Sequence, residues 1–268
     1  MEGRHGPFEE VIAWFKRIPP VTRILFTGTL LASLAAHFGL IRPFQFFFAP
    51  VPLIVPKLQI WRLVTNFFIQ PVKFDLLVNL FYLYSQSYAL ETSHFTNRTA
   101  DYGWCVFLVM MILNGISTAF FFLLPGYFMP VMSQPLIIAI VYVWSQFFRE
   151  VDVTFMFGLR FKALFLPWAL VALDILSGGN GISSLTGILA GHIYYFLDHL
   201  FPLQNDGQRI VSTPQFLYNY FPPPAGSGGA QHGQAPGTAG VAGGQQPAGP
   251  AGLRNRHTWG SGQRLGDG

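Results

Sequence analysis

The sequence has few charged residues and almost no cysteine. Asp, Glu, Lys and Arg make up 10% of the 268 residues, whereas a soluble globular domain usually carries about 25%. The stretch Gly103 to Phe148 contains none of them over 46 residues. The single cysteine, Cys105, excludes a disulfide or a cysteine-ligated metal site within one chain. The net charge of +4 is small and scattered, which argues against a nucleic-acid-binding protein.

The remaining composition is that of a membrane protein, with 51% hydrophobic residues. The hydrocarbon core of a bilayer, about 30 Å thick, is crossed by roughly 20 helical residues. The uncharged stretch 103–148 therefore predicts two spans, with a turn at LPGY, residues 124–127. Because the first ten residues are polar and the first apolar run begins near Val21, we expect no cleavable signal peptide.

Six transmembrane helices are predicted in all. The first four lie at about 21–40, 74–90, 103–124 and 127–148, and the stretch 163–205 holds two more, separated by SGGNG. A helix-like segment, FEEVIAWFKRI, precedes them and ends at a Pro-Pro pair, which suits the membrane interface. The predicted architecture is an all-α polytopic membrane protein. Residues 1–20 form an N-terminal interfacial segment on the cytosolic side, 21–205 the membrane domain and 206–268 a cytosolic tail.

The distribution of Lys and Arg predicts the orientation, because cytosolic loops carry an excess of these residues. With the N-terminus in the cytosol, nine of them lie near span ends on the cytosolic side and four on the other side. Both termini are therefore predicted to be cytosolic. The nine are Arg4, Lys16, Arg17, Arg23, Arg98, Arg149, Arg160, Lys162 and Arg209, and the four are Arg42, Lys57, Arg62 and Lys73.

The connection between the first two predicted spans, residues 41–73, has an unusual composition for a loop. It is too apolar to be solvated and contains too many prolines for a spanning helix. Its Phe, Trp and Arg content is typical of a segment at the level of the lipid headgroups. We therefore expect it to lie in the outer boundary of the bilayer.

A series of short motifs carries a resemblance to a known family. In order they are WRLVTNFF (61–68), ALET (89–92), ADYGW (100–104), YVWSQ (142–146), GLRFKALFLPW (158–168), GILAGHIYYF (187–196) and STPQFLY (212–218). Together, over roughly residues 8–220, they resemble the Derlin family, the rhomboid-like pseudoproteases of the endoplasmic reticulum. The resemblance implies a rhomboid-like six-transmembrane-helix bundle with an interfacial first loop.

Two pairs of residues within these motifs are candidate signature positions. Gly187 and Gly191 lie one turn apart on one helix face, where small residues let a neighbouring backbone approach closely. Trp61 and Arg62 fit a simple interfacial anchor. The resemblance implies instead that this second pair packs the first loop against the bundle. Neither pair is catalytic.

The residues of a protease dyad are missing from the sequence. A rhomboid protease needs a Ser nucleophile in a G-x-S-G turn at the start of the fourth span and a His base on the sixth. Ser133 lies near the expected depth but has no flanking glycines. Ser184 stands at the family's His position, and His192 comes eight residues later, about 12 Å further along the helix. No catalytic residue is therefore expected, and an active rhomboid serine protease is a disfavoured alternative.

Polar residues inside the predicted spans leave two interpretations open. Asp174 and His37 either belong to a site or reach the membrane interface, and their places near span ends favour the interface. Asn79, Asn114 and Gln146 either line a wet groove or form hydrogen bonds between helices, and packing is favoured. A solute channel or carrier remains a second alternative, but it often has inverted repeats, and none is visible. No metal or other cofactor is expected.

The tail begins with a featureless stretch. Residues 222–252 contain no Asp, Glu, Lys or Arg and no Phe, Tyr or Trp. Such a composition cannot bury a core and predicts a disordered linker. By random-coil scaling, it reaches about 30 Å on average.

A candidate docking peptide, WGSGQRLG at 259–266, follows this linker. It resembles the SHP box, which binds the N-terminal domain of the hexameric AAA ATPase valosin-containing protein. Trp259 and Leu265 offer apolar anchors, and Arg264 can pair with an acid. Gly260 and Gly262 let the backbone lie close to the partner. Chance in a Gly-rich tail is the alternative, but the placement of Trp, Arg and Leu favours docking.

The resemblance as a whole implies a function in endoplasmic-reticulum-associated degradation. Such a protein binds misfolded lumenal or membrane proteins and aids their retrotranslocation to the cytosol. The implied partners are the AAA ATPase, a membrane ubiquitin-ligase complex, the misfolded substrates and the lipid bilayer, and homo- or hetero-oligomers are also compatible with it. Composition alone indicates only a polytopic membrane protein with a docking tail.

Overall fold

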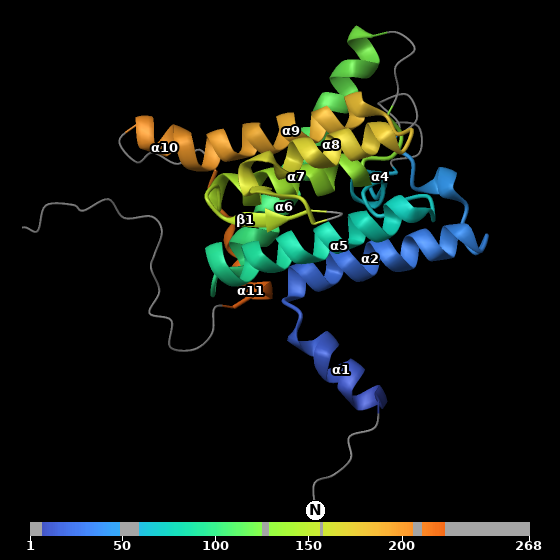
Figure 1. Ribbon diagram of the computed structural model, residues 1–268, viewed down its shortest axis with the longest axis horizontal. Coiled ribbons are helices and arrows are strands. Elements are labelled where there is room, and N and C mark those ends of the chain that lie inside the picture. The colour runs from blue at the N-terminus through green and yellow to red at the C-terminus, as the bar shows by residue number, and fades with distance from the viewer. Residues whose placement is uncertain (1–6, 49–58, 125–128, 156–157, 206–210, 223–268) are drawn as a thin grey trace, which may run out of the picture. The chain divides into compact units, whose positions relative to one another are not determined.

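The computed structural model describes residues 7–48, 59–124, 129–155, 158–205 and 211–222, and these ranges are mainly helical (Figure 1). The chain divides into two units, Met1–Ser227 and Gly228–Gly268. All described residues belong to the first unit. The linker from residue 223 onward and the candidate docking peptide lie outside the described residues.

A helix occurs at each position where the sequence predicts a span. These helices are α2 (Pro20–His37), α5 (Phe74–Ala89), α6 (Thr99–Leu123), α7 (Ser133–Phe147), α8 (Leu166–Leu176) and α9 (Gly181–Tyr195). The N-terminal helix predicted before the Pro-Pro pair is also confirmed, as α1 (Pro7–Arg17). Short π-helical segments, η2 (Leu90–His94) and η5 (Phe196–Leu200), extend α5 and α9.

One helix in the described ranges, α6, is both long and apolar enough to cross a membrane by itself. The pair Glu9–Arg17 and Pro20–His37 meets the same test jointly but is bent by 120°. The other helices are shorter, so the number of spans stays a prediction.

The remaining elements are short. They are η1 (Pro43–Gln45), α4 (Arg62–Thr65), η4 (Ala163–Phe165), α10 (Phe201–Gln204) and α11 (Gln215–Tyr220). Two strands, β1 (Asp152–Thr154) and β2 (Arg160–Lys162), form an antiparallel hairpin in which Asp152 lies opposite Lys162. The two side chains form an ion pair of 3.0 Å. This hairpin was not predicted from the sequence.

The core of the bundle is built around α7, which packs against α5, α8 and α9. All its residues from 136 to 141 are buried, as expected for a helix that is apolar on every side. On the other side of α5 lies α2, and the two helices run side by side (Figure 1). At one end of the bundle, α2 and α6 begin and α11 packs against α6. We call this the α11 end.

The structure differs from the predictions at the start of α7. The fourth span was predicted from Tyr127, a residue outside the described ranges, but the helix begins at Ser133. The chain before it pairs with the first loop instead of forming a helical turn. Phe48 N–H donates to the carbonyl oxygen of Pro130 at 2.8 Å, and Met132 N–H donates to that of Asn66 at 3.2 Å.

The end of the first loop packs against the helices, which the sequence did not predict. Phe67 and Ile69 are buried among them. Trp61, earlier in the loop, is 56% exposed, which agrees with an interfacial position for that part. Buried polar side chains of the bundle hold the backbone at the end of the loop, and the position of the loop relative to the bilayer stays a prediction.

Candidate functional site

The glycine pair of α9 lies against the backbone of α7. A Cβ atom on Gly187 would clash with the carbonyl oxygen of Pro135. One on Gly191 would lie 2.9 Å from the carbonyl oxygen of Ala139 and 3.0 Å from the ring of Tyr142. Real Cβ atoms essentially never lie within 3.0 Å of such neighbours. The distance between the two helices therefore depends on the absence of a side chain at Gly187, and Gly191 leaves little more room.

The serines at the two rhomboid positions are engaged elsewhere. Ser133 is buried, and its hydroxyl donates to the carbonyl oxygen of Ile69 at 2.7 Å. The hydroxyl of Ser184 donates to Asp174 Oδ2 at 2.5 Å. Among the hydrogen bonds of the described residues, neither serine is paired with an imidazole. These contacts join the first loop to α7 and the end of α8 to α9.

The two histidines weighed from the sequence have ordinary surroundings. His192 forms a hydrogen bond between Nδ1 and the hydroxyl of Tyr142 at 2.8 Å. This pair lies in the wall of a pocket of about 600 Å³ between α7, η4, α8 and α9, together with Gln146. His37 is the last residue of α2, exposed, with its ring edge-on to Phe38 at 5.6 Å.

Amide side chains of the helices hold the first loop in place. The side chain of Asn114 donates to the carbonyl oxygen of Leu63 at 2.8 Å and accepts from Asn66 Nδ2 at 3.0 Å. Asn79 donates to the side-chain oxygens of Gln70, at 3.2 Å, and Gln134. The packing interpretation therefore describes Asn79 and Asn114, both buried.

Three more polar side chains, those of Ser33, Gln146 and Arg62, form hydrogen bonds in the first loop or near the end of α7. The backbone N–H of Gln70 donates to Ser33 Oγ at 3.0 Å, which fixes the end of the first loop to α2. Gln146, near the other end of α7, accepts from Arg149 Nη2 at 2.8 Å. Arg62 Nη1 donates to the carbonyl oxygen of Phe47 at 3.2 Å. Arg62 therefore closes the first loop on itself, whereas the indole of its neighbour is exposed.

A buried carboxylate, which the sequence analysis did not single out, caps α2. Glu91 of the ALET motif is 4% exposed. Its Oε1 accepts from the backbone N–H of Val21 at 3.2 Å, and its Oε2 accepts from the N–H and the hydroxyl of Thr22 at 2.8 and 2.7 Å. Burial raises the pKa of Glu91, against the hydrogen bonds from Thr22 and Val21, which lower it. A helix N-terminus presents free N–H groups that favour an anion, and Pro19 has no side chain that could cap them.

The same network reaches α6. The hydroxyl of Thr22 lies 2.9 Å from that of Ser87, and the hydroxyl of Tyr102 donates to Ser87 Oγ at 2.6 Å. Three helices therefore meet at one buried hydrogen-bonded group. Tyr102 belongs to the ADYGW motif, so one hydrogen-bonded network, through Ser87 and Thr22, links it to Glu91 of the ALET motif.

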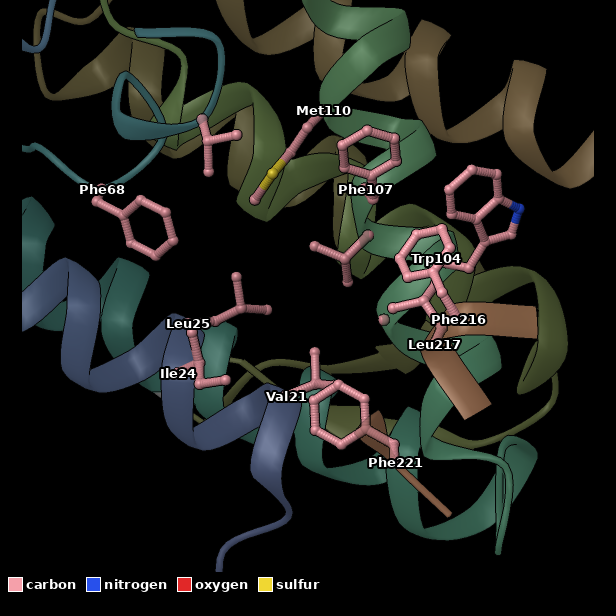
Figure 2. A pocket seen from close by; sticks show the side chains of 13 residues that line it. Val21, Ile24, Leu25, Phe68, Trp104, Phe107, Met110, Phe216, Leu217 and Phe221 are labelled. Carbon is pink, nitrogen blue, oxygen red and sulfur yellow. The ribbon is translucent and has the colours of Figure 1, made fainter. Parts of the chain in front are cut away.

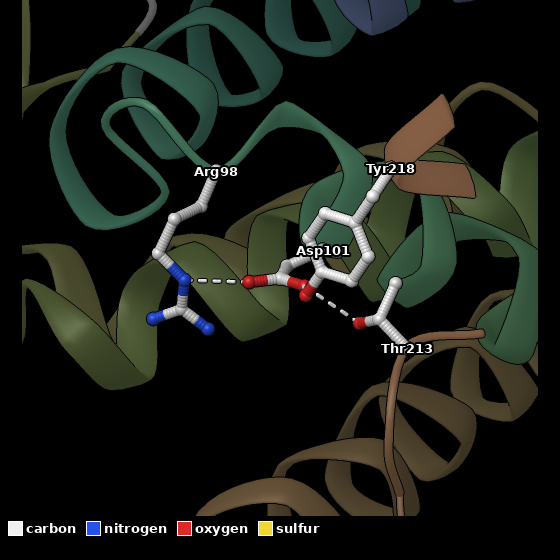
Figure 3. A network of polar contacts seen from close by, with 4 residues as sticks. All are labelled: Arg98, Asp101, Thr213 and Tyr218. Atoms are coloured by element: carbon white, nitrogen blue, oxygen red, sulfur yellow. Dashed lines mark hydrogen bonds and ion pairs between the residues drawn. The ribbon is translucent and has the colours of Figure 1, made fainter. Parts of the chain in front are cut away.

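A second buried carboxylate holds the C-terminal segment. Asp101 of the ADYGW motif is 7% exposed, and Figure 3 shows three side chains around it. Its Oδ2 accepts from Arg98 Nε at 2.5 Å, and its Oδ1 accepts from the hydroxyls of Thr213 at 2.7 Å and Tyr218 at 2.5 Å. Thr213 and Tyr218 come from the STPQFLY motif. We call these contacts the Asp101 clamp.

An apolar pocket of about 350 Å³ lies beside the clamp, between α2, α6 and α11 (Figure 2). Its walls contain no charged side chain. The lining residues are Val21, Ile24, Leu25, Val64, Phe68, Gly103, Trp104, Val106, Phe107, Met110, Phe216, Leu217 and Phe221. This chemistry suits an apolar group and offers no nucleophile or base.

An aromatic and histidine cluster lies where α5 and η2 meet α7 and η5. The rings of His94 and Phe147 are stacked with centroids 3.7 Å apart, and His199 lies edge-on to Phe147 at 5.7 Å. Burial, with the charges of Arg98 and His199, lowers the pKa of His94 to about 4. Among the described residues, no group of three or more His, Cys, Asp and Glu side chains could hold a metal ion.

Comparison with known proteins gives consistent matches. A family model described as the Der1-like family matches residues 18–215. The chain is 39% identical over 258 residues to Derlin-1 of Homo sapiens, covering 95% of this chain and 97% of that protein. It is 40% identical over 258 residues to Derlin-1 of Bos taurus, with the same coverage. It is 35% identical over 255 residues to Derlin-1 of Caenorhabditis elegans, covering 93% and 96%.

Proposed function

The chain belongs to the Der1-like family, and from this premise we propose that it is a non-catalytic factor of endoplasmic-reticulum-associated degradation. It binds misfolded lumenal or membrane proteins in the endoplasmic reticulum membrane and aids their retrotranslocation to the cytosol. The observation that carries the proposal is the match of the family model over residues 18–215, together with relatives named Derlin-1 that align along almost the whole chain.

The absence of catalysis is supported by the partners of the two serines. The hydroxyl of Ser133 donates to a backbone carbonyl and that of Ser184 to a carboxylate. A serine nucleophile needs a base that takes up its proton. His192, whose Nδ1 is bonded to Tyr142, is a separate pair on the 600 Å³ pocket.

A membrane domain of six spans with a thinned bilayer around it is part of the proposal. The six helices α2 and α5–α9 cross the membrane, with both chain termini in the cytosol. Two of them are short: α7 has 15 residues and α8 has 11. At 1.5 Å per residue, 15 residues reach only about 22 Å, less than the roughly 30 Å of a typical hydrocarbon core. A bilayer adapts to short spans by thinning locally, which lowers the barrier for a polar segment to cross.

The tail recruits the ATPase in this proposal. Residues 259–266 dock on valosin-containing protein through Trp259 and Leu265, with Arg264 as the polar contact, and residues 222–252 are the tether. A membrane ubiquitin-ligase complex marks the substrate. Tethering raises the local concentration of the ATPase at the membrane without any further contact.

A pull-down of valosin-containing protein by the detergent-solubilised full-length chain tests this step. We expect the chain with Trp259→Ala and Leu265→Ala to lose ATPase binding, while a control chain with Leu253→Ala and Asn255→Ala binds as the unchanged protein does. Both variants alter the same part of the tail, but the control lies before the docking peptide. Equal binding by both would refute docking through residues 259–266.

A further inference from the structure

The C-terminal segment, residues 211–222, is held more by hydrogen bonds than by burial. Its helix α11 has six residues, and Phe216 and Tyr220 are 62% and 83% exposed. The Asp101 clamp supplies two hydrogen bonds from this segment to α6. A short helix with so little buried surface gains little stability of its own. Its place on the bundle therefore depends on the carboxylate of Asp101.

The surface under this segment is an apolar groove between α2 and α6. Val21, Leu25 and Met110, which line it, are buried. Phe216, Leu217 and Phe221 of the C-terminal segment lie along one side of the pocket (Figure 2). The contact is a helix in a groove built from two other helices, a common way of binding an apolar peptide segment.

The C-terminal segment fills this groove incompletely. About 350 Å³ between it, α2 and α6 remains unfilled, and this space is open to the surroundings. A larger apolar side chain in the groove would gain dispersion contacts with its walls. In addition, the indole N–H of Trp104 in the pocket wall is buried and has no acceptor among the described residues. A helix with larger apolar side chains and a polar acceptor would satisfy both deficits.

The polar contacts of the clamp select the same kind of helix. Burial, and then the hydrogen bond to Asp101, raise the pKa of Tyr218 above its ordinary value, so its hydroxyl remains a proton donor. Asp101 retains Arg98 as a partner when the C-terminal segment leaves, because their ion pair of 2.5 Å lies within α6 and its N-cap. The carboxylate is then not left as an unpaired buried charge, which lowers the cost of exchanging one occupant for another.

We propose that the groove between α2 and α6 is a docking surface for a short apolar helix with aromatic anchors, that the C-terminal segment occupies it within the chain, and that an apolar helical segment of a client polypeptide displaces this occupant. The inference rests on the proposed function in taking the competing helix to come from a client. The docked α11 itself shows what chemistry the groove accepts: a helical turn with large apolar side chains and a hydroxyl donor near Asp101.

A cysteine reporter tests the displacement. The chain has one cysteine, Cys105, which is 4% exposed, so a Leu217→Cys variant carries one accessible thiol in the groove contact. In the purified full-length protein this thiol should react slowly with a maleimide. Adding Asp101→Asn should raise the rate at least about tenfold, because hydrogen bonds to a charged group are lost. The pair Thr213→Val and Tyr218→Phe, which leaves Asp101 and Arg98 unchanged, should raise it similarly.

A synthetic peptide of residues 211–222 is the probe for the competing helix. Added to the Leu217→Cys protein, it should raise the labelling rate in a saturable way. A matched peptide with Ser at the positions of Phe216, Leu217 and Phe221 should have no effect. Filling the groove by Gly103→Phe should abolish the response, because Gly103 lines the groove and a Cβ there meets only Val21, at 3.6 Å, so the added side chain starts without a clash.

Three results would overturn the inference. The first is that the Leu217→Cys thiol already reacts with maleimide as fast as it does with Asp101→Asn added. The second is that the peptide does not change the labelling rate. The third is that phospholipid vesicles alone raise the rate, which would make the groove a lipid site. None of these results affects ATPase recruitment through residues 259–266. A normal pull-down with a negative peptide result would therefore separate failure of the groove from failure of the proposed function.

Discussion

Replacing Gly187 or Gly115 by Ala makes the same chemical change in two helices, and we expect opposite effects on stability. Gly within a helix is less favourable than Ala by about 1 kcal/mol, so both substitutions gain that amount from helix propensity. A Cβ at Gly115 of α6 would meet nothing within 4 Å. Gly115→Ala should therefore stabilise the protein by up to about 1 kcal/mol.

At Gly187 the gain is outweighed by a steric clash. The added Cβ would overlap the carbonyl oxygen of Pro135, and its next neighbours are Pro135 Cα at 3.0 Å and Ile138 Cβ at 3.1 Å. Backbone atoms cannot rotate away, so α7 and α9 must separate within a fully buried core. Overpacking of this kind costs typically about 1–3 kcal/mol. Because the obstacle is backbone, we expect the upper end of that range and a net loss of about 2 kcal/mol.

Thermal unfolding of the purified protein in detergent micelles measures both effects. For a domain of this size, 1 kcal/mol shifts the melting temperature by about 2–4 °C. We expect Gly187→Ala to lower it by about 4–8 °C and Gly115→Ala to raise it by up to about 4 °C. Equal shifts in the same direction would show that the spacing of α7 and α9 does not depend on the absence of a side chain at Gly187.

Substitutions at three further residues test the buried polar and ionisable groups. Glu91→Ala leaves the N–H and hydroxyl of Thr22 without their acceptor, and each buried unsatisfied group costs about 1–3 kcal/mol. We therefore expect thermal unfolding to show a net loss of stability of about 2–4 kcal/mol for Glu91→Ala and a smaller loss for Glu91→Gln. Asn114→Leu should cost about 2 kcal/mol and speed proteolysis in the first loop, whereas unchanged protection would mean that Asn114 does not hold it. The pKa of His94 is about 4 in the folded protein against 6.5 ordinarily, so the unfolded chain takes up the proton first and stability should fall as pH drops from about 6.5 to about 4. His94→Phe, which keeps a ring on Phe147, should make the melting temperature less dependent on pH over that interval.

The positions of the main helices follow from the sequence because their cause is local. Apolar runs with few charges, interrupted by Gly and Pro, define α2 and α5–α9, and the Pro-Pro pair separates the charged helix α1 from α2. The spacing of Gly187 and Gly191 predicts a close helix contact for the same reason, since residues four apart share a face. The partner of that contact, α7, does not follow from spacing.

The two buried carboxylates depend on contacts between residues far apart in the sequence. Glu91 bonds to Thr22, 69 positions away, and Asp101 bonds to Tyr218, 117 positions away. Hydrophobic periodicity carries no information on such pairs, because packing of the whole bundle brings them together. The available signal was a single acid in each of two motifs beside apolar spans, and a helix that begins at Pro20 without a capping side chain.

The start of α7 and the contacts of the first loop did not follow from the sequence for the same reason. Composition predicts a loop at the membrane boundary but does not indicate that Asn114 and Ser133 bind its backbone oxygens. A polar residue in an apolar helix is ambiguous from sequence between a groove and a packing contact, and only its partner distinguishes them.

The most direct test of the proposed function is the half-life of a misfolded membrane protein in cells that lack this chain. The account predicts that degradation slows in its absence and is restored by the full-length protein, but not by the chain with Trp259→Ala and Leu265→Ala. A half-life that is the same with and without the chain would contradict a role in endoplasmic-reticulum-associated degradation.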